Sequence, residues 1–364
     1  MGERIVFHID FDYFFAQCEE IRNPELRTKP VCVCVFSDRG NDSGAIATAN
    51  YIARKFGVKS GMPIMFAKKR LEERKDAVFL PVDFDHYTNI SEIAMQIIKK
   101  DADIFEYVGK DEAYLDVTKR VNRDFSKASH LAQQIKNTLK EKLKISCSVG
   151  ISPNKLISKI ASDFKKPDGL TVVTPEKIEE FLEPLKIRDI PGIGKKTEEQ
   201  FSQMGIKTIG ELKSLDIFTL NKKFGRKIGT YIFNSVRGIN GEPVKEHEPT
   251  IQFSKIATLK KDSKDFAFLL ENMKESCKEL HSTIVKNNKM FKSVGIQLIQ
   301  SDLSNKTKSR MLRNPTNSYD ELEKNAEQLL KEALVDQHMN IRRLGVKVSE
   351  LSEMAGQSSI TSYF

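Results

Sequence analysis

The sequence predicts a multidomain α+β protein, and three observations indicate this class. With 364 residues the chain is too long for one ordinary hydrophobic core, so we expect about two to four domains. Strand and helix patterns alternate up to Val173, strands fade over 175–236, and the mixed pattern resumes at Ile251. The stretch 237–249 is polar, with two glycines and two prolines, as is typical of a linker.

The elements of the first part follow from apolar periodicity, in which short apolar or alternating runs predict strands and amphipathic runs predict helices. Together they suggest a sheet with helices on one face. Asp12 can cap the first helix, and Gly109-Lys110 can turn a β-hairpin that carries an acidic pair. The expected strands are 4–10, 31–36, 104–108, 112–117 and 145–151, and the expected helices are 13–21, 45–56, 91–100, 129–143 and 154–164.

The rest of the chain divides into a helical part and a second mixed part. Short helices punctuated by glycine are expected over 175–236. Residues 351–364 have no core-forming pattern and are expected to form a tail. In the second mixed part, strands are expected at 251–259, 292–299 and 342–348, and helices at 265–287 and 319–335.

Composition restricts the class of partner and the compartment. The net charge is +9, which favours a polyanion, with nucleic acid as the first candidate. The five cysteines form no CxxC pair and are odd in number, so we expect reduced thiols; a metal pair at Cys32 and Cys34 is disfavoured. A strand begins near the N-terminus and no apolar run reaches the ~20 residues of a membrane span. We therefore expect a cytoplasmic protein.

Two acidic stretches lie about a hundred residues apart. Asp10 ends a predicted strand just before a helix, and Asp111-Glu112 lies at the turn of the hairpin. Each stretch alone is more often a solvated strand end or turn, and Asp12 and Asp116 are expected to be a helix cap and a surface residue. If the fold brings them together, three carboxylates are what a pair of Mg²⁺ ions requires for phosphoryl transfer.

Three further patterns are candidates for phosphate contact. Gly192 and Gly194 in a Pro-Gly-Ile-Gly turn precede Lys195 and Lys196, which is typical of a helix-hairpin-helix that grips a DNA backbone, although an ordinary turn is the alternative. Within the helix expected at 45–56, one face could hold a triphosphate or be a solvated surface. The residues of that face are Thr48, Tyr51 and Arg54. A third candidate is the basic pair Arg342 and Arg343, which could touch DNA or merely be exposed.

The C-terminal tail has the pattern of a docking peptide. Ile360, Tyr363 and Phe364 would lie on one side of a single turn, with Gln357 as a polar anchor. Apolar anchors on a tail without a core pattern are typical of segments that order on a partner.

Together these motifs resemble those of Y-family, translesion-type DNA polymerases of the DNA polymerase IV branch, most closely the archaeal ones. The matching segments run in order over nearly the whole chain: 9–17, 47–58, 111–116, 149–152, 154–155, 159–162, 166–167, 191–194 and 341–346. The resemblance implies a right-hand polymerase: a ferredoxin-like palm (1–12 and 79–167), small fingers (13–78), a helical thumb with a helix-hairpin-helix (168–236), a linker (237–249), an α+β little finger (250–348) and a flexible tail (349–364).

The resemblance also implies roles for individual residues. Asp10 and Asp111 would hold two Mg²⁺ ions, Glu112 would hold the catalytic one, and the carbonyl of Phe11 would add a ligand. Phe15 would be the steric gate that excludes a ribose 2′-hydroxyl. The triphosphate would be held by Thr48, Tyr51, Arg54, Lys166 and the amides of Phe14 and Phe15. Where the family often has Ser and a hydrophobic residue before the acidic pair, this chain has Gly109-Lys110, which adds a charge beside the expected metal site.

The function implied is template-directed addition of dNTPs to a primer 3′ end, without proofreading and with low fidelity and low processivity. The expected partners are primer-template DNA, dNTPs and a ring-shaped sliding clamp that binds Gln357, Ile360, Tyr363 and Phe364, and the protein is expected to be a monomer. A non-catalytic DNA-binding scaffold is the alternative, and it would need degenerate palm carboxylates. A nucleotidyl cyclase-like enzyme is a weaker one, because it leaves the second half of the chain unexplained.

Overall fold

The computed structural model describes residues 4–40, 42–246, 250–335 and 337–353. These residues form two compact units, each described by itself. One unit contains the described residues of Met1–Val35 and Ala45–Glu248, and the other contains those of Phe36–Gly44 and Pro249–Phe364.

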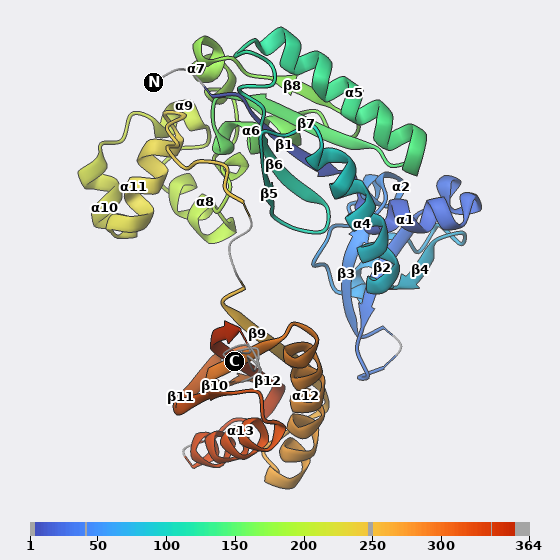
Figure 1. Ribbon diagram of the computed structural model, residues 1–364, viewed down its shortest axis with the longest axis vertical. Helices are drawn as coiled ribbons and strands as arrows, with labels where there is room; N and C mark the ends of the chain where they lie inside the picture. The colour runs from blue at the N-terminus through green and yellow to red at the C-terminus, as the bar shows by residue number, and fades with distance from the viewer. Residues whose placement is uncertain (1–3, 41, 247–249, 336, 354–364) are drawn as a thin grey trace, which may run out of the picture. The chain divides into compact units, whose positions relative to one another are not determined.

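The first unit is built on a five-stranded sheet in the order β5-β6-β1-β7-β8 (Figure 1). β1 lies between β6 and β7 and is antiparallel to both, which confirms the predicted first strand and the predicted hairpin. The register places Asp10 opposite Glu112 on one side and opposite Ser148 on the other. The strands are β1 (Val6–Phe11), β5 (Ile104–Tyr107), β6 (Glu112–Asp116), β7 (Cys147–Ser152) and β8 (Leu170–Val172).

Helices cover both faces of this sheet, so the expectation of one covered face is wrong. On one face, Phe7, Ile9 and Phe11 pack in a core with α4 (Phe84–Lys99) and α5 (Phe125–Leu143). α6 (Lys155–Phe164) packs on the other face against β1 and β7. The cause is visible in β7, which is buried at every position and therefore needs cover on both sides.

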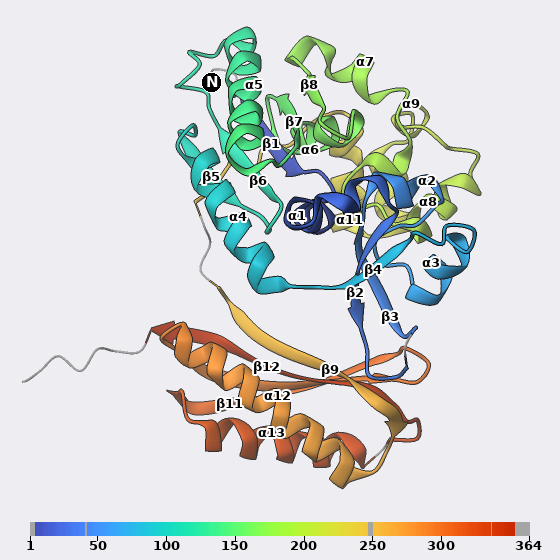
Figure 2. The ribbon, with the colours of Figure 1, turned by 90° about the vertical axis from the view of Figure 1, so that its right-hand side faces the viewer.

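Residues between β1 and α4 form a smaller, three-stranded sheet with the order β3-β2-β4 (Figure 2). The helix expected at 45–56 is wrong, because Gly44–Ala49 is the strand β3 and only Tyr51–Lys55 is helical (α2). Asn50 makes the boundary: its buried side chain accepts hydrogen bonds from the backbone N–H of Val31 and of Ala53. It therefore caps α2 while it binds β2 (Val31–Phe36), which pairs in parallel with β4 (Val78–Pro81).

Several short elements complete the first unit. Phe14–Arg22 forms α1, Pro24–Thr28 forms the 3₁₀-helix η1, and Ile64–Arg70 forms α3. The region 175–236 is helical as predicted, and its core around Leu182, Phe201 and Ile232 includes residues of α6. Its elements are η2 (Pro175–Lys177), α7 (Ile178–Leu182), η3 (Ile187–Asp189), α8 (Lys195–Ser202), α9 (Ile209–Leu212), α10 (Ile217–Phe224) and α11 (Arg226–Ser235).

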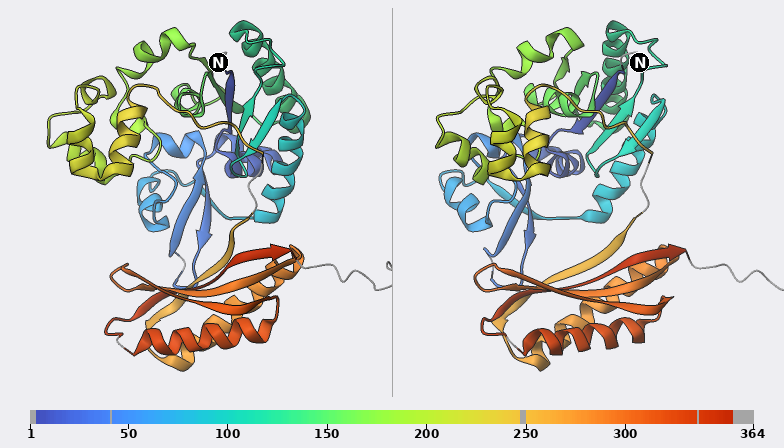
Figure 3. Two further views of the ribbon diagram at one scale, coloured as in Figure 1. Left: turned by 60° about the vertical axis from the view of Figure 1, so that its left-hand side comes forward. Right: turned by 90° about the vertical axis from the view of Figure 1, so that its left-hand side faces the viewer.

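The second unit is a four-stranded antiparallel sheet, β11-β10-β12-β9, with two helices on one face (Figure 3). The sequence analysis missed β11, because its residues are almost all polar and it is an exposed edge strand without an apolar period. β12 also continues into the stretch expected as tail. The elements are β9 (Gln252–Ser263), α12 (Phe266–Lys286), β10 (Lys289–Gln300), β11 (Asn305–Thr316), α13 (Tyr319–Leu334) and β12 (Ile341–Glu353).

Candidate active site

Carboxylates from the two acidic stretches meet at one end of the five-stranded sheet. Oxygen atoms of Asp10 and Glu112 and a ring nitrogen of His8 all lie within 4.8 Å of one another. The backbone N–H of Phe11 donates to the carbonyl oxygen of Asp111 at 2.8 Å, which holds the hairpin turn against β1. The long-range pairing of β1 with β6 therefore brings together residues that are far apart in sequence.

Two lysine ammonium groups lie against these carboxylates. Lys166 Nζ is 2.6 Å from Asp10 Oδ1 and 2.8 Å from Asp163 Oδ1. Lys159 Nζ is 2.5 Å from Glu112 Oε2, and His8 Nε2 is 3.2 Å from the same oxygen. The site therefore combines partly buried acidic oxygens with cations that balance them.

The structure shifts the pKa values of the three carboxyl groups in different directions. Burial raises the pKa of Asp10 to about 7, in spite of the opposing effect of Lys166. Burial and the nearby charge of Glu112 also raise the pKa of Asp111. The hydrogen bond with His8 lowers the pKa of Glu112 to about 2; burial opposes this and Lys159 assists it. Burial lowers the pKa of His8, which favours a neutral imidazole.

The donor set fits a hard divalent cation. Mg²⁺ prefers carboxylate and carbonyl oxygens, and Asp10 and Glu112 supply two carboxylates within the cluster. Asp111, beside Glu112, is held against β1 by its backbone carbonyl, and its carboxylate is not part of the group that lies within 4.8 Å. His8 lies within the same cluster, but its Nδ1 is 2.7 Å from Ser162 Oγ and its Nε2 contacts Glu112. Its contacts therefore suit it to orienting Glu112.

Asp12 is not the helix cap that the sequence analysis expected. The N-cap of α1 is Tyr13, in a left-handed conformation with φ 38°, and α1 has no side-chain cap. Asp12 is instead buried and accepts hydrogen bonds from Ser146 Oγ at 2.9 Å and Ser148 Oγ at 2.7 Å. The reason is that the main chain continues the β1–β7 ladder past Phe11, with Asp12 N–H donating to the Ser146 carbonyl at 3.1 Å. Asp116 accepts from the Thr118 N–H at 2.9 Å, a local turn contact.

The charge of Lys110 lies away from the carboxylate pair that follows it in sequence. Its ammonium donates to Thr88 Oγ1 on α4, and its carbonyl oxygen accepts from Ser91 Oγ at 2.5 Å. The departure at Gly109-Lys110 thus docks the hairpin turn onto α4.

The residues expected to hold a triphosphate are divided between a strand and a helix. Thr48 lies in β3, whereas Tyr51 and Arg54 lie in α2, so the three do not share one helical face. The guanidinium carbon of Arg54 is 4.9 Å from the centre of the Tyr51 ring, and Arg54 Nε donates to the Ala49 carbonyl at 2.8 Å. The Tyr51 hydroxyl is buried and, within the described part of the chain, has no hydrogen-bond partner. Such a hydroxyl is suited to bind a ligand oxygen.

Phe14 and Phe15 are the first two residues of α1, at the helix end where backbone N–H groups lack intrahelical acceptors. The Phe15 ring is held by aromatic neighbours. It stacks on Tyr87 with the ring centres 4.6 Å apart and an angle of 14°, and it meets Phe84 edge-on at 6.0 Å. These contacts restrict its rotation.

The residues expected to contact DNA lie in both units. Gly192 has φ +82°, a conformation that favours glycine, and Gly194 is the N-cap of α8, which begins with Lys195 and Lys196. The Tyr231 hydroxyl donates to the Pro191 carbonyl at 2.6 Å, which ties this turn to α11. Arg342 and Arg343 lie in β12 of the second unit. The expected clamp-binding residues Gln357, Ile360, Tyr363 and Phe364 lie outside the described residues.

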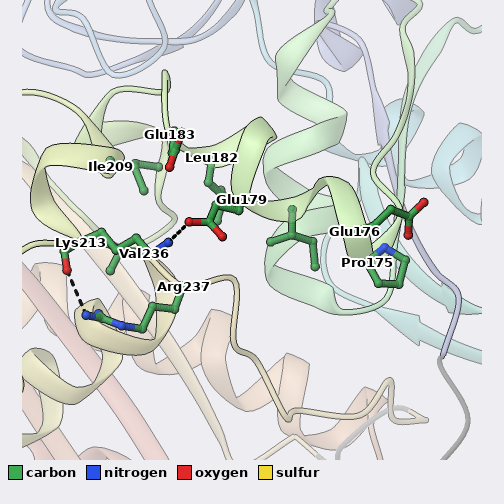
Figure 4. A pocket seen from close by; sticks show the side chains of 11 residues that line it. Pro175, Glu176, Glu179, Leu182, Glu183, Ile209, Lys213, Val236 and Arg237 are labelled. Atoms are coloured by element: carbon green, nitrogen blue, oxygen red, sulfur yellow. Dashed lines mark hydrogen bonds and ion pairs between the residues drawn. The ribbon is translucent and has the colours of Figure 1, made fainter.

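A cavity of about 280 Å³ lies elsewhere in the helical region 175–236 (Figure 4). Its two cationic side chains already have partners. Lys213 forms an ion pair with Glu179, and Arg237 donates to the Lys213 carbonyl at 3.0 Å and to the Phe233 carbonyl at 2.9 Å. None of the expected site residues lines it, so the carboxylate cluster is the better candidate for chemistry.

Sequence reasoning missed His8, Lys159 and Asp163. His8 precedes Asp10 by two residues in β1, and this period places both side chains on one face. Asp163 precedes Lys166 by three residues, the spacing of a neighbouring pair. These spacings were available in the sequence, but only the packing of α6 on β1 shows that they meet.

Comparisons with known proteins agree along the whole chain. Family models match the impB/mucB/samB family at residues 9–163, its C-terminal domain at 251–362, and the DNA polymerase-iota thumb domain at 188–240. Among the described residues, no helix is long and apolar enough to cross a membrane.

Relatives with curated names and solved structures point to the same family. The chain is 74% identical to the DNA polymerase IV of Nitrosopumilus maritimus and 40% identical to that of Methanosarcina acetivorans, in each case over 100% of both chains. A Y-family DNA polymerase chimera of Dbh and Dpo4 has a TM-score of 0.88 at 36% identity, covering 96% of this chain and 99% of that one. The insertion ternary complex of Dbh DNA polymerase has a TM-score of 0.69 at 37% identity, covering 95% and 98%. The chain therefore belongs to the Y-family of DNA polymerases, in its DNA polymerase IV branch.

Proposed function

We propose that this chain extends a primer 3′ end with dNTPs on a template, using two Mg²⁺ ions, and that it tolerates damaged templates. The observation that carries the proposal is the meeting of Asp10 and Glu112 at one sheet edge, beside Asp111 and two lysines. Asp10, Asp111, Glu112 and the Phe11 carbonyl would hold the metal, which when bound activates the 3′-hydroxyl and neutralises phosphate charge. Family membership supports the use of divalent metal in general.

The domain assignment is part of the same proposal. The five-stranded sheet without β8 would belong to a palm (1–12 and 79–167), and the smaller sheet to fingers (13–78). The helical region would belong to a thumb (168–236), a range that also contains β8. The second unit corresponds to a little finger (250–348), after a linker at 237–249. The second unit has its own hydrophobic core, which supports the border at the linker, whereas the core of the helical region also contains residues of α6.

The nucleotide would lie between α1, α2 and Lys166. The unpartnered Tyr51 hydroxyl, the Arg54 guanidinium and the Lys166 ammonium offer donors, and the α1 N-terminus offers free backbone N–H groups at Phe14 and Phe15. Thr48 would add a hydroxyl. Lys166 already pairs with Asp10, so a metal on Asp10 would free its ammonium for phosphate oxygens.

Residues of both units would bind the phosphate backbone of DNA. The Gly192–Gly194 turn and the start of α8 present N–H groups and lysine charge to a phosphate. In β12, Leu344, Val346 and Val348 are buried, so Arg343 and Lys347 project from the opposite face of the sheet. That face is therefore the proposed DNA surface of the second unit, with Arg342 as a further contact.

Primer extension tests the site. We expect Asp111→Asn and Glu112→Gln to lower extension by orders of magnitude while DNA binding is kept. Asp116→Asn is the matched control, because Asp116 makes only the contacts of a turn with Thr118. Near-normal extension by the first two variants would exclude the metal-ligand assignment. If the wild-type protein binds DNA but does not extend a primer, the result favours the alternative of a non-catalytic DNA-binding scaffold.

Sugar selection tests Phe15. Its ring is clamped by Tyr87 and Phe84, so Phe15→Ala should remove a fixed barrier and admit ribonucleotides. Phe84→Ala is a control that removes only a neighbour of the ring. Unchanged discrimination by Phe15→Ala would refute the gate.

Two further assays address lesions and the clamp. Extension on undamaged, abasic and bulky-adduct templates should show bypass on at least one damaged template; arrest at every lesion would contradict it. Removal of residues 357–364 should abolish stimulation by a sliding clamp while basal extension persists. Equal loss of both would argue against a docking role.

A further inference from the structure

The position of Lys166 depends on a short segment between two elements. α6 ends at Phe164 and β8 begins at Leu170, so Lys166 lies on a connection of five residues. Its ammonium must nevertheless reach Asp10, at 2.6 Å. A displacement of about 1 Å in a positioning group can cost roughly a hundredfold in rate, so whatever holds this segment is important to the reaction.

Asp12 holds the segment from the side of β1. Its Oδ2 accepts a hydrogen bond from the backbone N–H of Asp168 at 2.8 Å. Ser148 Oγ, which donates to Asp12 Oδ1 at 2.7 Å, also accepts from the N–H of Gly169 at 3.1 Å. Two consecutive backbone donors of the segment are therefore bound by Asp12 and by its own partner. Asp12 is only 1% exposed, so water does not compete for these bonds.

Lys136 holds the same segment from α5. Its ammonium is buried and donates to the Asp168 carboxylate at 2.8 Å, to the Gly169 carbonyl at 3.0 Å and to the Cys147 carbonyl at 2.6 Å. These three bonds use all the donors of a lysine. Lys140 forms a second ion pair with Asp168. Asp168 itself has φ 57°, which for a residue other than glycine is maintained only by such surroundings.

The segment also closes tightly on itself. A Cβ atom at Gly169 would lie 2.4 Å from the Lys165 carbonyl oxygen, so the residues on either side of Lys166 are in close backbone contact. A turn that is closed by its own backbone and bound from two elements has little freedom. The side chain of Lys166 is therefore presented from a fixed base.

We propose that Asp12, Ser148 and Lys136 are positioning residues for nucleotide binding, which act by fixing residues 166–169 and hence the Lys166 ammonium. Asp12 follows β1, two residues after Asp10, and its carboxylate accepts from Ser148, the residue opposite Asp10 in the sheet. The same end of β1 thus carries the carboxylate that meets the Lys166 ammonium and the carboxylate that binds the backbone N–H of Asp168. The nucleotide part of this inference rests on the proposed contact between Lys166 and the triphosphate.

A double-mutant cycle tests the inference, with the KM for dNTP and the Kd for primer-template DNA as separate readouts. We expect Asp12→Ala to raise the KM for dNTP by roughly tenfold to a hundredfold, as does Lys166→Ala, with little change in the Kd for DNA. The double variant should be no worse than Lys166→Ala alone, because Asp12 acts through Lys166. Asp12→Asn should recover part of the loss, since its amide oxygen still accepts from Asp168 N–H.

Asp116→Ala is the matched control, because Asp116 also binds a backbone N–H but at a turn away from the segment. The proposal would be overturned if the increase in KM of the double variant equalled the product of the increases of the two single variants. An unchanged KM in Asp12→Ala would overturn it as well. If Asp12→Ala does not fold, Ser148→Ala removes one link of the network and should raise the KM in the same direction; an unchanged KM there would count against it.

Hydrogen exchange separates this inference from the proposed function. If Lys166→Ala leaves the KM unchanged, the phosphate contact of Lys166 is wrong, but the amides of Asp168 and Gly169 still report on the segment. They should exchange faster in Asp12→Ala than in wild type or Asp116→Ala. Equal exchange in all three proteins would show that Asp12 does not hold the segment.

Discussion

Asp10 and Glu112 face each other across one strand pair, yet their carboxyl groups have opposite affinities for a proton. Asp10 has its pKa raised to about 7 because burial outweighs the contact with Lys166. Glu112 has its pKa lowered to about 2, chiefly by hydrogen bonding with His8. The Glu112 carboxylate is therefore ready to bind a cation at all ordinary pH values, whereas Asp10 must first lose a proton.

The first prediction concerns pH. Because bound metal requires ionised Asp10, the affinity for Mg²⁺ or Mn²⁺ should rise as pH increases toward about 7 and then level off. The metal-free protein should show the opposite trend in stability: the unfolded carboxyl ionises near 3.8 and the folded one near 7, so stability falls as pH rises through that window. Calorimetric metal titration and thermal unfolding between pH 5 and 8 measure both.

Asp10→Asn provides the control for this prediction. It cannot ionise, so it should lose the part of the pH dependence of metal binding and of stability that Asp10 contributes. Metal affinity that stays constant from pH 5 to 7 in the wild type would contradict the prediction.

The second prediction concerns Lys110. Its ammonium is bound to Thr88 on α4, so the charge does not lie on the carboxylates. We expect Lys110→Ala to change the Mg²⁺ dependence of extension by less than about twofold, since it removes one partly exposed hydrogen bond. Thr88→Ala should behave in the same way. A large change in metal dependence with Lys110→Ala alone would mean that the ammonium reaches the site.

At the scale of elements, the packing of α6 on the sheet decides which side chains reach the carboxylates. α6 brings Lys159, Ser162 and Asp163 over β1 because β7 has a glycine at the contact. A Cβ atom at Gly150 would lie 1.9 Å from the Ser158 carbonyl oxygen and 2.4 Å from the Ser162 nitrogen. Only glycine allows this approach.

The third prediction follows from that contact. Gly150→Ala must move α6 away from β7, and overpacking of this kind typically costs about 1–3 kcal/mol of stability. We expect a clear loss in the free energy of unfolding by denaturant, and a weaker contact between Lys159 and Glu112 because Lys159 moves with the helix. Gly241→Ala, where a Cβ would meet nothing within 4 Å, is the control. Equal stability of the two variants would contradict the packing argument.

At the scale of the whole molecule, charge and its distribution determine the affinity for DNA. The net charge of +9 attracts a polyanion, and counterion release makes such binding depend on salt. On the second unit, Arg343 and Lys347 project from the sheet face opposite the helices. Lysines on the helices lie on the other side of the sheet. One of them is Lys274 of α12, which pairs with Glu323 at 2.8 Å.

The fourth prediction uses this division. Replacing Arg343 and Lys347 by alanine should weaken DNA binding uniformly across sequences and reduce the slope of log K against log salt by roughly 1–2. Lys274→Ala should leave the slope unchanged. Titrations of labelled primer-template at several salt concentrations provide the measurement, and equal slopes for all three proteins would exclude this face.

Local information was sufficient for most elements and for the class of chemistry. The strand at β1, the hairpin of β5 and β6, and the helical region 175–236 have clear periods and turn residues, and each forms as predicted. Failures came where a local pattern was ambiguous or absent. The run 45–56 has the sequence pattern of a helix, but in the structure Asn50 binds the neighbouring strand β2 and ends the strand β3. β11 has too few apolar residues to be recognised from its sequence. Both were decided by pairing with the preceding strand, β2 for β3 and β10 for β11.

The sequence by itself determined the family and named Asp10, Asp111 and Glu112 as candidate ligands, because short motifs carry that information. The tertiary structure alone decided how those carboxylates are balanced and what supports them. His8 reaches Glu112 because β1 pairs with β6, and Lys159 reaches it because α6 packs on β1. Lys166 reaches Asp10 from the segment that follows α6. Asp12 became a buried acceptor because the main chain continues the β1–β7 ladder past Phe11. Lys159 and Glu112 are 47 positions apart and the other pairs more than a hundred, and no periodicity within either segment encodes their distance or burial.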